Sequence, residues 1–182
     1  MSANPQKKYK AIRDAAGQIV TSEFCKIEPS LTGHLRITDI DGVALRYLRN
    51  AWKPHPEKSK NVGGPDEWKY FVQQYRVSYS SRVEAAIWYD NHLCALLLGK
   101  CSRNKYIARI SYLQGNFDDT YLKGLRTHIA TRFLEVFAAA NKIQWVGIQA
   151  PYHGAVPLYT LRGYVLQDPF DHRNDALCKK LT

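Results

Sequence analysis

Basic residues surround a glycine at the point where the sequence predicts that a long helix begins. The stretch YLKGLRT, residues 121–127, follows a predicted strand and leads into an apolar helical pattern. Free backbone N–H groups and the helix dipole at such a start both face an incoming anion, so this order of elements is typical of a phosphate site. Arg126, with Lys123 beside it, could bind phosphate through charge-assisted hydrogen bonds, or its side chain could crowd the backbone away from the ligand.

A tyrosine near the C-terminus is the second residue of interest. The stretch GAVPLYTLRGY, residues 154–164, predicts a short helix that ends on Gly163 and turns directly into a strand, with Tyr159 on that helix. A helical tyrosine most often packs its ring into the core and keeps its hydroxyl at the surface. Any further role for Tyr159 depends on the elements around it.

Two amphipathic helices are predicted in the first half of the chain. Apolar residues recur at helical spacing over residues 38–52, behind the capping candidates Thr38 and Asp39. A second helix, PDEWKYFVQQY, is predicted over residues 65–75. The stretch between them, residues 53–65, is rich in proline, glycine and lysine and predicts an exposed loop.

The rest of the chain predicts a sheet with further helices. Three strand-like runs separated by short polar turns predict an antiparallel meander: RVEAAIWY, HLCALLLGKCS and KYIARISYLQG. The longest helix is predicted over residues 121–142, with Asn141 as its stop. A strand over 143–150, the short helix, and strands over 164–168 and 176–181 complete the chain.

The first thirty residues allow two readings. The stretch YKAIRDAAGQIVTSEF could form a hairpin about a turn from Asp14 to Gly17, or a helix that passes into a strand. Gly17 and the β-branched pair Ile19 and Val20 favour the hairpin.

Composition narrows the class of protein. Lys and Arg number 26 against 16 Asp and Glu, and the net charge of +10 favours anionic partners such as nucleic acid or a polyphosphate cofactor. The four cysteines form no C-x-x-C pair, which argues against a zinc site or a disulfide framework, and three of them are expected to be small buried residues. No stretch reaches the roughly 20 apolar residues of a membrane helix and no secretory signal is expected, so we expect a cytoplasmic protein without a membrane partner.

The succession of elements, together with LYTLRGY, resembles the GNAT superfamily of acyl-CoA-dependent N-acetyltransferases. The family pattern A-x-x-L-Y-x-x-x-G-F/Y is matched at every position, by Ala155, Leu158, Tyr159, Gly163 and Tyr164. The resemblance runs from about residue 35 to the C-terminus. It implies an α/β (α+β) fold with a mixed, mostly antiparallel sheet, a splayed central strand pair and flanking helices. We expect a single domain over residues 1–182, with 1–34 as an N-terminal extension whose structure the sequence leaves open.

The chain departs from the family pattern in two places. The pyrophosphate motif usually reads Arg or Gln, two residues, Gly, any residue, then Gly or Ala; here Gly124 is present, but Arg126 stands at the second small position. The asparagine usually found a few residues before the alanine is replaced by Tyr152. The first departure bears on whether the cofactor binds.

The resemblance also implies roles for individual residues. In this family the third meander strand splays from its neighbour, its main chain holds the acyl carbonyl and the pantetheine arm, and the following turn holds the pyrophosphate. The candidate cofactor-binding residues are therefore Ser111, Tyr112, Leu113, Lys123, Gly124, Leu125, Arg126 and Thr127. Tyr159 would act as the general acid that protonates the departing thiolate. Acetyl-CoA is the implied co-substrate, and no metal is expected.

A general base would relieve the amine acceptor of its proton. The acidic and imidazole candidates near the expected cleft are Glu84, Asp118, Asp119 and His153. Glu84 lies in an otherwise apolar strand and is the second catalytic candidate; it could be a buried carboxylate of raised pKa, or more simply an outward-facing charge. Asp118 and Asp119 are more simply helix-start acids.

These observations predict an enzyme that moves the acetyl group of acetyl-CoA to a primary amine. Residues 38–75 would build the acceptor pocket, where aromatic residues alternate with lysines and arginines and could stack on bases. An aminoacyl-tRNA or a nucleobase amine is therefore an option, and the few acids argue against cationic acceptors. The alternative is a catalytically inactive GNAT-like protein that binds nucleic acid (tRNA or DNA) or serves as an adaptor. A longer acyl chain and a homodimer both stay open.

Overall fold

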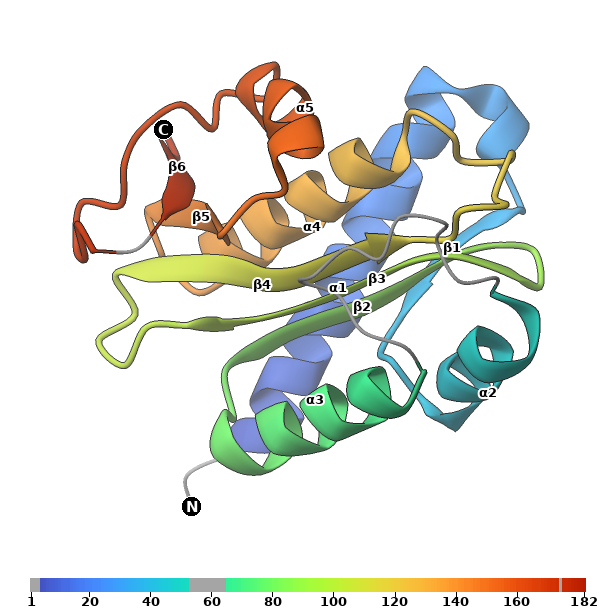
Figure 1. Ribbon diagram of the computed structural model, residues 1–182, viewed down its shortest axis with the longest axis horizontal. Coiled ribbons are helices and arrows are strands. Elements are labelled where there is room, and N and C mark those ends of the chain that lie inside the picture. The colour runs from blue at the N-terminus through green and yellow to red at the C-terminus, as the bar shows by residue number, and fades with distance from the viewer. Residues whose placement is uncertain (1–3, 53–64, 174) are drawn as a thin grey trace.

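The computed structural model describes residues 4–52, 65–173 and 175–182, so the loop predicted over 53–65 lies almost entirely outside the described residues (Figure 1). The α-helices are α1 (Pro5–Ile27), α2 (Gly42–Ala51), α3 (Pro65–Ser78), α4 (Arg126–Ala140) and α5 (Val156–Thr160). The strands are β1 (Leu35–Thr38), β2 (Arg82–Tyr89), β3 (His92–Cys101), β4 (Ile107–Gly115), β5 (Trp145–Gln149) and β6 (Ala176–Lys180). Two 3-10 helices, η1 (Pro29–Leu31) and η2 (His153–Ala155), precede β1 and α5.

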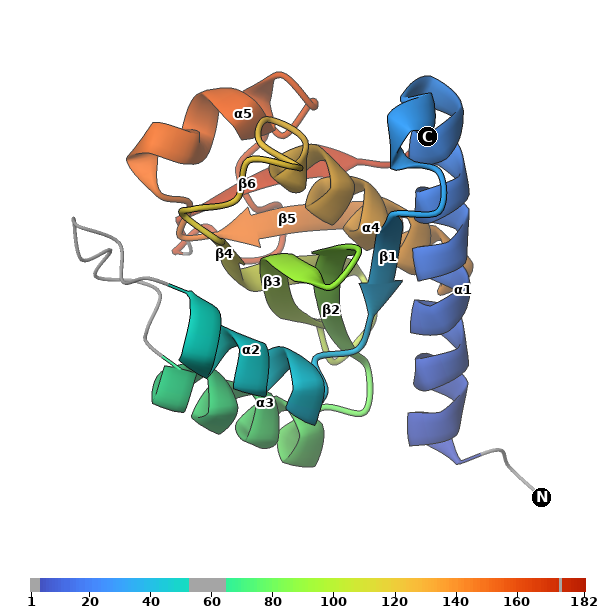
Figure 2. The same cartoon turned by 90° about the vertical axis from the view of Figure 1, so that its right-hand side faces the viewer.

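One six-stranded sheet forms the centre of the molecule, with its strands in sequence order from β1 to β6. Every neighbouring pair is antiparallel except β4 and β5, which are parallel. Helices cover both faces, with α1 and α4 on one and α2 and α3 on the other (Figure 2). The expected mixed, mostly antiparallel sheet with flanking helices is confirmed, including all three strands of the meander.

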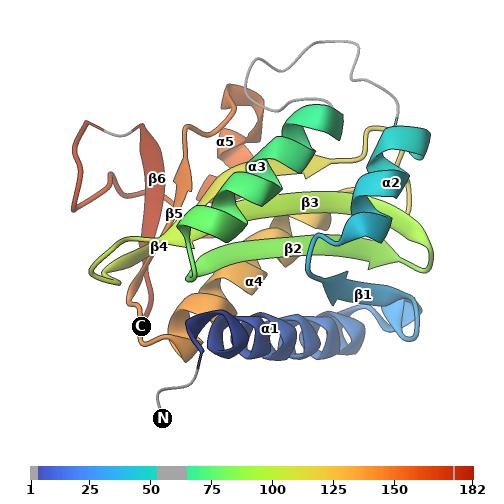
Figure 3. The same ribbon diagram turned by 90° about the horizontal axis from the view of Figure 1, so that it is seen from below.

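The hairpin expected in the first thirty residues is wrong, because these residues form α1, which has 23 residues and is the longest helix described. Asn4 caps it by accepting a hydrogen bond from the Gln6 N–H. Its buried side follows helical spacing, through Tyr9, Arg13, Ala16, Gly17, Val20 and Phe24. The helix packs along α4 and β1 and runs beneath the sheet in Figure 3.

Gly17 marks a close approach between α1 and β1 and not a turn. A Cβ atom at this position would lie 3.2 Å from the carbonyl oxygen of Ile37 on β1, which is tighter than ordinary packing. The glycine and the two β-branched residues after it therefore point to a hairpin by local pattern only. The tertiary contact with β1 decides the structure instead.

We expect Gly17→Val to destabilise the protein by about 1–3 kcal/mol, because the added side chain must push α1 away from β1. The free energy of unfolding from urea titration would measure this. The control is Gln18→Val on the exposed side of the same helix, where only the helix propensity changes, by less than about 1 kcal/mol. Equal losses in the two variants would contradict the close approach.

Three other predicted boundaries are corrected. Thr38 ends β1, and Asp41 is the residue that caps α2, accepting from the Ala44 N–H at 2.9 Å. Asp39 instead forms an ion pair with the buried Arg13 of α1, with the Nε–Oδ1 distance at 2.7 Å. The predicted helix over 121–142 begins only at residue 126, and residues 121–125 form turns. The strand expected over 164–168 is reduced to one bridge between Leu166 and Cys178.

The cysteines behave as the sequence predicts. Cys94, Cys101 and Cys178 are buried and free, and burial raises the pKa of Cys101 to about 12 and that of Cys178 to about 11. Within the described residues, no cluster of three or more His, Cys, Asp or Glu side chains could hold a metal ion. Of the helices that the structure describes, none is long and apolar enough to cross a membrane.

Candidate active site

The parallel strands β4 and β5 pair over only four residues, and β5 ends at Gln149, one residue beyond its last paired position. Their pairing ends at Ile110 and Ile148, whereas β4 continues to Gly115 and pairs only with β3 on its other side. The edge of β4 that faces β5 is therefore free of strand pairing from Ser111 to Gly115. Such an edge offers a row of backbone N–H and C=O groups to an extended ligand.

A β-bulge between β3 and β4 lies at the point where the pairing of β4 with β5 ends. Leu98 of β3 pairs with Tyr112 and Gly99 pairs with Ile110, which leaves Ser111 as the extra residue of β4. A Cβ atom at Gly99 would overlap the carbonyl oxygen of Arg109, so β4 bends closely over this glycine. The bulge turns the backbone of Ser111 away from the regular ladder.

We expect Gly99→Ala to cost about 1–3 kcal/mol and to remove ligand binding along β4, because the methyl group cannot coexist with the bulge as it stands. Thermal unfolding with and without acetyl-CoA would show both effects. Gly42→Ala is the matched control, since a Cβ atom there meets no neighbour within 4 Å. A Gly99→Ala protein as stable and as responsive to acetyl-CoA as the control would contradict this role.

Polar side chains bridge the gap just beyond the last paired residues. The Ser111 hydroxyl donates a hydrogen bond to Oε1 of Gln149, at the end of β5, over 3.2 Å. The Tyr75 hydroxyl of α3 also lies within hydrogen-bond reach of Ser111, and burial raises the pKa of Tyr75. Gln149 is missing from the predicted site; its only sequence signal is a polar residue at the carboxyl end of a buried strand.

Aromatic side chains cover the α3 side of this region. The Tyr112 ring stacks on Phe71 at a centroid distance of 4.3 Å, and Trp68 and Tyr75 meet it edge-on. Trp68 is fully buried and donates its indole N–H to Gln114 at 2.5 Å. Three of the six aromatic residues of the predicted acceptor segment thus pack against β4, and Tyr70 is exposed.

The turn before α4 leaves backbone donors open. Gly124 has a φ of +85°, a conformation that favours glycine, and α4 begins two residues later. Leu125 occupies the N-cap position and provides no side-chain hydrogen bond, so no side chain caps the first-turn N–H groups of Thr127 and His128. Lys123 is exposed beside them. These groups suit an anion at the start of α4.

Arg126 points into this turn. Its guanidinium donates to the carbonyl of Asn116, lies 3.7 Å from the carboxylate of Asp119 and packs where a Cβ of Gly115 would be. Phosphate binding by Arg126, which the sequence favoured, would require this guanidinium to leave the turn. Through these contacts Arg126 instead connects the end of β4 to the start of α4.

Tyr159 lies on α5, which packs beside α4 (Figure 2), and is 5% exposed in the core shared with α4. Its hydroxyl makes no hydrogen bond to any described residue, whereas the neighbouring Tyr164 hydroxyl contacts Glu135 at 3.3 Å. Burial raises the pKa of Tyr159 to about 12. The side chain therefore keeps its proton at neutral pH and has no internal acceptor for it.

Glu84 is buried and fully engaged, so the expectation of an outward-facing charge is wrong. Its two carboxylate oxygens accept hydrogen bonds from Arg76 at 2.8 Å and from Arg82 at 2.5 Å. The residue lies in one cross-strand row with Leu98 and Tyr112, about 10 Å from the latter at the usual strand spacing. A catalytic role for Glu84 stays a prediction.

The other acidic and imidazole candidates lie in the turn before α4 and in η2. Asp119 is buried and accepts from the N–H groups of Tyr121 and Leu122, so it orders the turn and not the helix start. Asp118 is exposed in the same turn, and His153 is exposed in η2. The structure does not bring these three side chains together with Glu84.

The chain matches no family model and no curated protein. Among solved structures it is similar to an acetyltransferase of the GNAT family from Staphylococcus aureus Mu50, with a TM-score of 0.61 and 9% identity over 81% of this chain and 99% of that one. A spermidine N-acetyltransferase chimera from Vibrio cholerae and hSSAT has a TM-score of 0.56 and 13% identity, over 81% of this chain and 96% of that one. A third similar structure is a Salmonella typhimurium acetyltransferase that modifies the N-terminal serine of ribosomal protein L7/L12. It has a TM-score of 0.53 and 11% identity, over 84% of this chain and 98% of that one. The chain therefore has the GNAT fold, which confirms the resemblance at the level of structure.

Proposed function

We propose that this protein is an N-acyltransferase that moves an acyl group from an acyl-CoA, most simply acetyl-CoA, to an amine. The observation that carries the proposal is the free edge of β4 from Ser111 to Gly115, which opens at a bulge and leads through one turn to the start of α4. The GNAT fold supports it.

The residues along this path fit the cofactor. A pantetheine arm is an extended chain with amide groups, which suits the unpaired N–H and C=O groups of Ser111, Tyr112 and Leu113. Its pyrophosphate suits the uncapped N–H groups at the start of α4, with Lys123 beside them and Gly124 and Leu125 shaping the turn. The net charge of +10 favours such a polyanion.

When bound, acyl-CoA supplies an acyl group activated as a thioester. Main-chain N–H groups at the Ser111 bulge stabilise negative charge on the acyl oxygen. Tyr159 holds its proton on Oη and delivers it to the departing sulfur; burial raises its pKa to about 12, so the hydroxyl is protonated throughout the physiological range. The Tyr75 and Gln149 side chains position the Ser111 hydroxyl across the gap.

The acceptor enters this site as a free amine. Both oxygens of Glu84 are bound by arginines, so we propose that the proton lost by the acceptor nitrogen goes to water and not to Glu84, and that it balances the proton that Tyr159 gives to the sulfur. The aromatic wall of α3 and β4 can hold an amine on an uncharged or ring-bearing group, whereas the predicted acceptor segment has few of the carboxylates that would neutralise a polyamine. An aminoacyl-tRNA or a peptide N-terminus is accordingly preferred over spermidine.

The test is release of free CoA from acetyl-CoA with three acceptors: spermidine, a short peptide and an aminoacyl-tRNA. The proposal predicts turnover with the last two above that with spermidine, and for tRNA a KM that rises steeply with salt. Binding of acetyl-CoA without turnover on any amine would favour the inactive, nucleic-acid-binding alternative. Absence of acetyl-CoA binding would refute the proposed function.

A further inference from the structure

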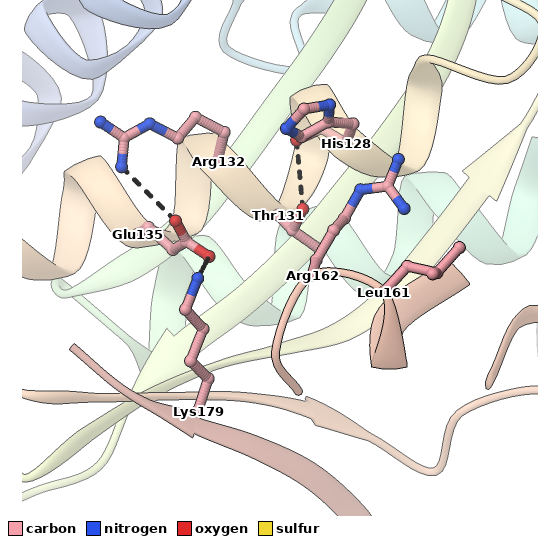
Figure 4. Close-up of a pocket in the computed structure, with 7 residues that line it drawn as sticks. All are labelled: His128, Thr131, Arg132, Glu135, Leu161, Arg162 and Lys179. Atoms are coloured by element: carbon pink, nitrogen blue, oxygen red, sulfur yellow. Dashed lines mark hydrogen bonds and ion pairs between the residues drawn. The ribbon is translucent and has the colours of Figure 1, made fainter. Parts of the chain in front are cut away.

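A pocket of about 340 Å³ lies between α4, the chain that follows α5, and β6. Four side chains of α4 line it, together with Lys179 of β6 and with Leu161 and Arg162, which follow α5 (Figure 4). Three of the lining residues carry a positive charge and one, Glu135, a negative charge. No step of the proposed reaction uses this pocket.

The two acidic residues near the pocket, Glu135 and Glu23, form ion pairs with two of its basic residues. Glu135 accepts from Lys179 at 2.8 Å and from Arg132 at 3.4 Å. Arg132 also binds both carboxylate oxygens of Glu23 on α1, at 2.7 and 2.8 Å. These contacts hold Lys179 and Arg132 in place at one end of the pocket (Figure 4).

Arg162, at the other end of the pocket, has no carboxylate partner among the described residues. Its Nη1 donates to the carbonyl of Leu158 at 2.6 Å, and its Nε is buried without a partner. The guanidinium extends toward His128 (Figure 4), and its charge, after burial, lowers the pKa of that imidazole. An unneutralised guanidinium with a buried, unused donor favours an anion.

The position of the pocket connects it to the cofactor. His128 lies two residues after Arg126, so the pocket begins about 3 Å along the axis from the start of α4, where the pyrophosphate is proposed to bind. CoA carries a third phosphate, a monoester on the ribose of its adenosine. Leu161 is 82% exposed and offers apolar surface beside Arg162 for the nucleoside.

We infer that this pocket binds the 3′-phosphate of CoA, with Arg162 as its principal ligand and Lys179 and His128 beside it. The inference rests on the proposed function, because it assumes that CoA binds along β4. It goes further by assigning recognition of the adenosine end to residues that the sequence pattern does not mark. It also explains why Arg162 lacks an acidic partner.

Calorimetric titration with CoA and with 3′-dephospho-CoA tests the inference. Wild-type protein should bind CoA about tenfold more tightly than 3′-dephospho-CoA. In Arg162→Gln the affinity for CoA should fall to that for 3′-dephospho-CoA, while the affinity for 3′-dephospho-CoA stays unchanged. Arg162→Lys should recover part of the difference, because it restores a charge without the planar donor set.

Arg103→Gln is the matched control, since it removes the same charge from an exposed turn between β3 and β4; it should keep the tenfold preference. Equal binding of CoA and 3′-dephospho-CoA by the wild type would overturn the inference and leave the proposed function intact. If neither binds, both fail. If inorganic phosphate then stabilises the wild type but not Arg162→Gln, the pocket takes phosphate from another source, which also overturns the inference.

Discussion

Replacing Tyr159 by phenylalanine is expected to lower kcat by about 100-fold or more, the usual contribution of a general acid. The fold should not suffer, because the Tyr159 hydroxyl makes no hydrogen bond to any described residue and the phenyl ring fills the same space in the core. CoA release would measure the first effect and the thermal unfolding midpoint the second. The KM for acetyl-CoA should change little, since the proton transfer belongs to the transition state.

Tyr164→Phe is the matched control for Tyr159→Phe. Tyr164 is buried nearby, and its hydroxyl contacts Glu135 at 3.3 Å, so its loss should cost about 1 kcal/mol of stability and leave kcat nearly unchanged. The two variants thus separate catalysis from packing. An unchanged kcat in Tyr159→Phe would mean that Tyr159 only packs.

The pH profile carries a second signature of Tyr159. The acid acts in its protonated form, so its contribution is lost only as the pH rises through its pKa, which burial raises to about 12. Wild-type kcat should therefore show no fall from this group up to a pH of about 10, where an ordinary tyrosine would be half ionised. Protonation of the acceptor amine lowers kcat on the acidic side of the pH profile, so it does not obscure the behaviour of Tyr159 at high pH.

Glu84→Gln is expected to lower the free energy of unfolding by about 3 kcal/mol or more, because it leaves the guanidinium groups of Arg76 and Arg82 without their shared carboxylate. For a protein of this length such a loss corresponds to a decrease of about 6–12 °C in the thermal midpoint. The change is large because the carboxylate is fully buried. Chemical denaturation would confirm the magnitude.

Glu28→Gln is the control for Glu84→Gln, because the Glu28 side chain is exposed and its carboxylate accepts a hydrogen bond from Ser30 alone among the described residues; its midpoint should stay within about 2 °C of wild type. Enough folded Glu84→Gln protein should remain at low temperature to assay kcat per folded molecule, which we expect to be near that of the wild type. A Glu84→Gln protein of normal stability that had lost turnover would instead identify Glu84 as the base.

Local patterns predict the elements whose structure depends on their own residues. The meander from Arg82 to Gly115 has short apolar runs separated by polar turns, and Asn141 ends α4 as the sequence indicates. The motif around Tyr159 identifies the GNAT fold from the sequence, because its spacing corresponds to a helix, a glycine turn and the chain segment that follows. In these places local preference and tertiary structure agree.

The errors arise where a distant contact decides the structure. Gly17 is read as a turn because its close neighbour, Ile37, lies on another element. For Arg126 the phosphate role stays a prediction, and its contacts with Asn116 and Asp119 could not be foreseen because they form only when the turn folds. Glu84 is read as an exposed charge because the two arginines that neutralise it cannot be recognised from spacing alone.

The most direct test of the central claim is backbone hydrogen–deuterium exchange of the wild-type protein with and without saturating acetyl-CoA. The account predicts that amides over residues 111–115 and those of Thr127 and His128 exchange at least about tenfold more slowly with the ligand, because they pair with the pantetheine arm and the pyrophosphate. Protection confined to other segments, or none at a ligand concentration that saturates binding, would contradict the assignment of this gap as the acyl-CoA site.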